Sequence, residues 1–66
     1  MIEADIWRAA YKMIEMHGLD AGWHAGMRAD HLLDQGDVAG CNAWKRIVSA
    51  IKEVQQTARP EGKILN

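Results

Sequence analysis

Apolar residues recur every three or four positions along three stretches of the chain, a spacing that predicts helices. The stretches cover about residues 3–17, 20–35 and 38–57, and no run alternates with a period of two for long enough to form a strand. Helices joined by such short connections favour antiparallel or steeply crossed neighbours. The sequence therefore predicts a compact all-α three-helix domain over residues 1–57, followed by a loose C-terminal tail over residues 58–66.

Two glycine–aspartate pairs mark the expected helix boundaries. Gly18 precedes Asp20, and Gly36 precedes Asp37. Glycine accepts the left-handed backbone conformation that often ends a helix, and an aspartate side chain can accept hydrogen bonds from the free N–H groups of the next helix. Each pair is therefore expected to end one helix and begin the next.

The apolar stripes of the three predicted helices differ in side-chain size. The first contains Ile6, Ala9, Ala10, Met13, Ile14 and His17. The third contains Cys41, Trp44, Ile47, Val48, Ile51 and Val54, of which Trp44, Ile47, Val48 and Ile51 are assigned to the core. The second contains Gly22, Ala25, Gly26, Ala29, Leu32 and Leu33. Because glycines destabilise a helix, we expect its small residues to pack closely against a bulky partner such as Trp44 or Trp7.

Composition narrows the class of protein. The chain has 66 residues, 48% of them hydrophobic, with a formal net charge of -1 and one cysteine, so no internal disulfide can compensate for the small size. It contains no apolar run of about 18 residues and no leader pattern, so neither a membrane span nor secretion is expected. A cytoplasmic location is the expectation.

The chain is rich in large side chains for its length, with three tryptophans, one tyrosine and four methionines. Three thin stripes cannot easily enclose all of these, and an apolar patch left outside a core usually marks an interface. We expect a protein–protein interaction or self-association module, either a homodimer or one with an unidentified protein partner. The predicted contact residues flank the main stripes and are Trp7, Tyr11, Trp23 and Met27. The alternative is that each tryptophan covers a groove within the monomer.

Catalytic and metal chemistry receive little support from the residues. Cys41 lies on an apolar stripe, where a thiol behaves as a small hydrophobe, so we expect no enzyme activity and no cofactor. His17, His24 and His31 are spaced by seven residues, and Asp20 precedes His24 by one turn, which is compatible with a metal site. A turn is expected to separate His17 from the other two, however, so the spacing by seven is not one helical face. The explanation without a metal is the stronger one: a helix C-terminus favours His17, and a polar flank with nearby aspartates accounts for His24 and His31. No metal is therefore expected.

Nucleic-acid binding is the second functional hypothesis. A short turn before the third helix matches the outline of a helix-turn-helix module, a small DNA-binding regulator. Candidate contacts on that helix are Asn42, Lys45, Arg46 and Lys52. The balanced charge and the acid at the start of this helix, Asp37, argue against it.

The stretch from Arg28 to Ile51 resembles a group of short uncharacterised bacterial helical proteins. It contains an Ala-Asp-x-Leu-Leu run at residues 29–33, a Gly-Asp turn at 36–37, and then Gly40 and Trp44 before an isoleucine-containing helix. The opening at residues 5–10 is similar as well. The resemblance implies a bacterial cytoplasmic helical protein, and it transfers no catalytic or binding residue.

Overall fold

The computed structural model describes residues 3–58, and these residues are helical almost throughout. The elements are α1 (Glu3–His17), the 3-10 turn η1 (Gly18–Asp20), α2 (Ala21–Asp34) and α3 (Val38–Ala58). The prediction of an all-α fold is confirmed for this part of the chain, which contains no strand. Three separate helices are not clearly present, because α1, η1 and α2 follow one another without a non-helical residue and form one bent stretch.

The bend lies at Gly18. Its φ of +61° is the left-handed conformation predicted for it, but the chain then continues as a 3-10 turn instead of a loop. The predicted cap at Asp20 is wrong, since its side chain makes no capping hydrogen bond. The bend is held instead by the carbonyl oxygen of Gly18, which accepts the backbone N–H of Ala21 and, at 3.0 Å, the Nε2 amide of Gln55 from α3.

The second boundary is built as predicted. Gly36 has a φ of +83°, and its N–H donates to the carbonyl of Leu33 at 2.9 Å, while the N–H of Asp37 donates to the carbonyl of Leu32 at 2.8 Å. This pair of bonds is a Schellman motif, which satisfies carbonyls that the end of α2 leaves free. Asp37 then caps α3, because its Oδ1 accepts the N–H of Gly40 at 2.8 Å.

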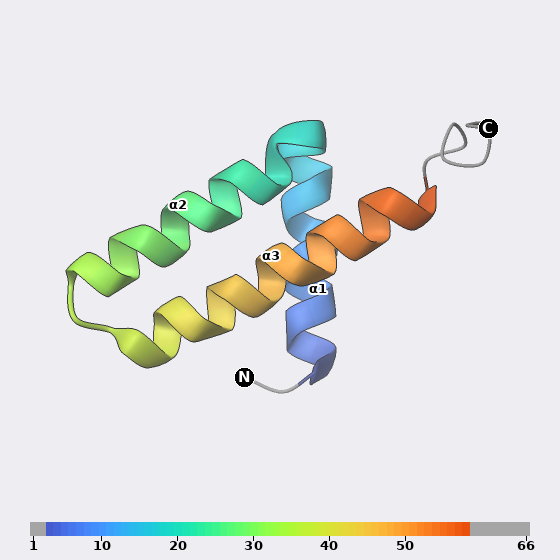
Figure 1. Cartoon of the computed structure of the whole chain (residues 1–66). Helices are drawn as coiled ribbons and strands as arrows, with labels where there is room; N and C mark the ends of the chain where they lie inside the picture. The colour runs from blue at the N-terminus through green and yellow to red at the C-terminus, as the bar shows by residue number, and fades with distance from the viewer. Residues whose placement is uncertain (1–2, 59–66) are drawn as a thin grey trace.

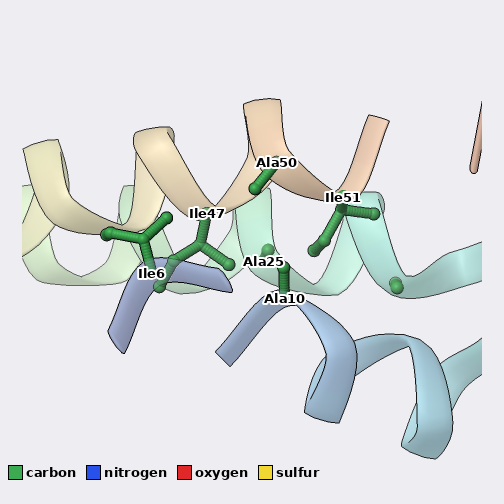
Figure 2. Packing of buried hydrophobic residues seen from close by; sticks show 7 residues of the cluster. Ile6, Ala10, Ala25, Ile47, Ala50 and Ile51 are labelled. Carbon is green, nitrogen blue, oxygen red and sulfur yellow. The ribbon is translucent and has the colours of Figure 1, made fainter. Parts of the chain in front are cut away.

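In Figure 1, α2 and α3 lie side by side and antiparallel, and α1 crosses them. The core forms where the three meet. Figure 2 shows side chains of all three helices pointing toward one another there, with Ile6 and Ala10 from α1, Ala25 from α2, and Ile47, Ala50 and Ile51 from α3. The largest fully buried side chains are Ile47, Ile51 and Cys41, and much of the remaining core is alanine. The core is therefore thin.

The core assignments of the third stripe are confirmed for Ile47 and Ile51, while Trp44 and Val48 are half-buried against the core. The second stripe is partly wrong. The buried face of α2 is Ala21, Ala25 and Ala29, and Leu33 is 50% exposed. The expected bulky partner is also wrong: a Cβ on Gly22 would lie 4.0 Å from Ile51 Cγ2, and a Cβ on Gly26 would have no neighbour within 4 Å.

The helix boundaries differ little from those predicted. The predicted tail over residues 58–66 falls largely outside the described residues, except that α3 continues through Ala58. Within residues 3–58, no helix combines the length and the apolar character that crossing a membrane requires.

Candidate functional site

The surface is hollowed by a groove between α2 and α3, which we call the Gly26 groove. It has a volume of about 420 Å³ and is lined by Gly22, Trp23, Gly26, Met27, Ala29, Asp30, Lys45 and Val48. Gly26 lacks a side chain and Ala29 has a small one, so α2 fills little of the space between the two helices at these positions. Trp23 lines the groove and is 65% exposed, so a large aromatic surface borders it.

Two of the four predicted contact residues come together at this groove. Trp23 and Met27 occupy neighbouring turns of α2 and both line it. Trp7 lies elsewhere: it is half-buried against the core, donates its Nε1 hydrogen to Glu3 Oε2 at 3.2 Å, and lines a separate hollow with α3. Tyr11 is 59% exposed on α1 and lines none of these hollows.

The Gly26 groove also carries two opposite charges. Asp30 on α2 and Lys45 on α3 both line it, and neither forms an ion pair with another of residues 3–58. The ion pairs found among the described residues are Arg8 with Asp5 and Arg46 with Glu3, both on the surface. The sequence reasoning did not connect Asp30 with Lys45, because only the antiparallel pairing of α2 and α3 places them at one groove.

The candidate nucleic-acid contacts are all on the surface of α3. Asn42, Lys45, Arg46 and Lys52 are exposed, as DNA binding requires. Arg46 is however engaged with Glu3, its Nη2 lying 2.9 Å from the Glu3 Oε1 atom. Lys45 shares a groove with Asp30, and the capping carboxylate of Asp37 sits at the helix end that would enter a groove of DNA. These acids lower the positive potential that binding to phosphates needs.

A second groove, of about 390 Å³, lies where α1, α2 and α3 approach one another beside the bend; we call it the His–Met groove. It is lined by Met13, Met16, His17, His24, Met27, Arg28, His31 and Trp44. A turn separates His17 from the other histidines along the chain, as expected, but it brings the His17 and His24 rings together instead of keeping them apart. The rings of His17 and His24 are stacked, with centroids 3.8 Å apart and planes inclined by 20°, because η1 continues the chain as a tight turn.

Two residues with potential chemistry are placed unfavourably for it. Cys41 is buried at 2% exposure, so its thiol is not accessible to a substrate. Across residues 3–58, no three side chains of histidine, cysteine, aspartate or glutamate converge as ligands of a metal ion. Asp20, proposed as a partner of His24, is not among the residues that line the His–Met groove.

Comparison of the chain with protein-family models, with curated proteins and with solved structures finds no match in any of the three. The resemblance to short bacterial helical proteins stays a prediction from the residues.

Proposed function

We propose that this protein is a small self-associating interaction module, and that two copies meet through the Gly26 groove about a twofold axis. The observation that carries the proposal is the exposed Trp23 ring beside a channel that Gly26 leaves open. In a twofold interface the same patch is used by both copies, so each Trp23 can enter the channel of its partner. Exposed aromatic residues beside a pocket are the usual anchors of such contacts.

The charges favour a second copy of this chain over an unrelated partner. In the proposed dimer, Asp30 of one copy pairs with Lys45 of the other, and the twofold axis repeats this contact, giving two such pairs per dimer. Because neither side chain has an ion-pair partner within residues 3–58, the contact gains attraction without breaking an existing pair. A groove that carries one acidic and one basic side chain can therefore offer opposite charges to a second copy of itself.

The thin core supplies a reason for association. A domain of this size buries a small fraction of its surface and has little stability to spare. A tryptophan offers about 150–250 Å² for burial. Covering the 65% of Trp23 that is exposed, at about 25 cal/mol per Å², contributes roughly 2–4 kcal/mol per copy. Since association itself has a large entropic cost, we expect a weak, concentration-dependent dimer.

A charge exchange tests the pairing of Asp30 with Lys45. Each single variant, Asp30→Lys and Lys45→Asp, places like charges at both contacts of its own homodimer and should be monomeric by light scattering. An equimolar mixture of the two should form a heterodimer, because each contact then joins opposite charges. The exposed Lys12→Asp variant, on α1 and away from the groove, should associate like the natural chain.

Two results would defeat the proposal. One is association of both single variants as strong as that of the natural chain; the other is a mixture that stays monomeric after the natural chain has been shown to dimerise. The same variants address the second hypothesis. Retardation of duplex DNA by the natural chain at low salt, lost on Lys45→Asp, would favour a DNA-binding regulator instead.

A further inference from the structure

The His–Met groove gathers a chemically distinctive set of side chains. Its lining includes all three histidines of the chain and every methionine within residues 3–58. Within each helix, a thioether and an imidazole share one face: Met13 and His17 are four residues apart on α1, and His24 and Met27 are three apart on α2. The bend at Gly18 turns these two pairs toward one groove.

The two imidazoles are close enough to share one ion. Ring nitrogens bound to the same metal ion at about 2 Å each lie no more than about 4 Å apart. The centroids of His17 and His24 are 3.8 Å apart. The lone pairs of an imidazole lie in the plane of its ring, so binding requires the rings to turn out of the stack toward the ion. Both residues are only half-buried, which leaves space for that rotation.

The surrounding residues select the class of ion. None of the residues lining the groove is a carboxylate. The one permanently charged side chain among them is Arg28, whose guanidinium carbon lies 5.3 Å from the centroid of the Trp44 ring. Hard divalent ions such as Mg²⁺ need oxygen ligands, and structural Zn²⁺ sites use cysteine, histidine or carboxylate. Thioethers favour Cu(I), and imidazole is also a copper ligand.

We propose that the His–Met groove binds a soft monovalent metal ion, Cu(I) or its redox-inert analogue Ag(I), through Met13, His17, His24 and Met27. The ion would join α1 to α2 across the bend, so binding stabilises the relative orientation of the two helices. Met16, which is 62% exposed against 43% for Met27, and the exposed His31, two turns beyond His24 on α2, are not assigned to the ligand set.

Titration of the natural chain with Ag(I), followed by NMR of the methionine methyl groups and histidine rings, tests the assignment. Saturation is expected at an equimolar ratio, with large shifts of the Met13 and Met27 methyl signals and loss of the ring-stacking shifts of His17 and His24. The double variant Met13→Leu with Met27→Leu preserves shape but lacks both sulfurs, and it should lose saturable binding. His17→Gln should lose it independently.

Four controls make the result decisive. Cys41→Ala removes the thiol that competes for soft metals, and binding must persist in it. Met16→Leu and His31→Gln match the ligand substitutions chemically and should bind Ag(I) like the natural chain. Excess Zn(II) should leave the Ag(I)-bound spectrum unchanged. Loss of binding in Cys41→Ala, equal losses in the control and ligand variants, displacement by Zn(II), or no methyl shift at equimolar Ag(I) would overturn the proposal.

Discussion

Replacement of Gly26 by alanine should stabilise the protein. Gly26 lies within α2, its φ is not positive, and a Cβ built on it would have no neighbour within 4 Å. The new methyl group therefore causes no clash in the monomer, while the helix gains the difference in propensity between alanine and glycine. That difference is about 0.8–1.0 kcal/mol in the interior of a helix. In a domain of this size, about 1 kcal/mol raises the Tm by roughly 4–8 °C.

A second glycine of the same kind provides the matched contrast. Gly40 lies in the first turn of α3, but a Cβ there would be 2.5 Å from Asp37 Oδ2, in the carboxylate that caps this helix. The carboxylate must move, and loss of such a cap costs about 0.5–2 kcal/mol. Gly40→Ala should therefore show no gain, or a loss, where Gly26→Ala shows a gain.

The assay is urea and thermal unfolding followed by circular dichroism, at protein concentrations low enough to keep the chain monomeric. Both variants are measured beside the natural chain. Failure of Gly26→Ala to raise the free energy of unfolding would mean that the groove is filled in the folded monomer or that α2 is not helical there. An equal gain for Gly40→Ala would show that Asp37 does not cap α3 as described.

Three further substitutions test the core and the cap of α3. Ile47→Ala should lower the free energy of unfolding by about 2–5 kcal/mol, because it leaves a cavity where α1, α2 and α3 meet. Urea titration should show that most of the stability is lost. A loss below about 1 kcal/mol, the scale of an ordinary surface substitution, would contradict the packing. Asp37→Ala should lower the free energy of unfolding by about 0.5–2 kcal/mol, because the N-cap of α3 is lost. Asp37→Asn should retain most of that stability, since asparagine also caps helices well. Equal losses for the two variants would show that the loss does not come from the cap.

The parts of the fold that were predictable are those set by local chemistry. The spacing of Ile47 and Ile51 fixes the inner face of α3, and the Gly36–Asp37 pair alone carries the Schellman turn and the following cap. At Gly18 the same glycine–aspartate signal gives a different outcome. There the chain continues as a 3-10 turn, and the bend is held by Gln55, which is distant in sequence.

The face that α2 buries depends on non-local packing. Alanines at positions 21, 25 and 29 form the buried face of α2, whereas Leu33, the next residue of the same i to i+4 row, is 50% exposed near the end of the helix. The spacing of the second stripe does not show where along α2 this burial ends, because that depends on which parts of the helix the neighbouring helices cover.

In the candidate sites too, features set by local sequence were predictable and features set by the packing of distant segments were not. Trp23 and Met27 share a groove because they lie one turn apart on one helix, and the sequence predicted both. Trp7 was grouped with them, but its position depends on how α1 packs against α3. The approach of His17 to His24 requires the tight bend, so the spacing by seven could not reveal it. The part of the His–Met groove that the sequence indicates is the i to i+4 spacing of Met13 and His17, which places both side chains on one face of α1.

Self-association through the Gly26 groove is tested most directly by the mass of the particle in solution as a function of protein concentration. Light scattering behind size exclusion should show the natural chain shifting from monomer toward dimer as concentration rises. Trp23→Ala should remain monomeric with its helicity retained, whereas Tyr11→Ala, which removes an equally exposed aromatic ring outside the groove, should dimerise normally. A natural chain that stays monomeric at every concentration, or a Trp23→Ala variant that dimerises as well as Tyr11→Ala, would contradict the account.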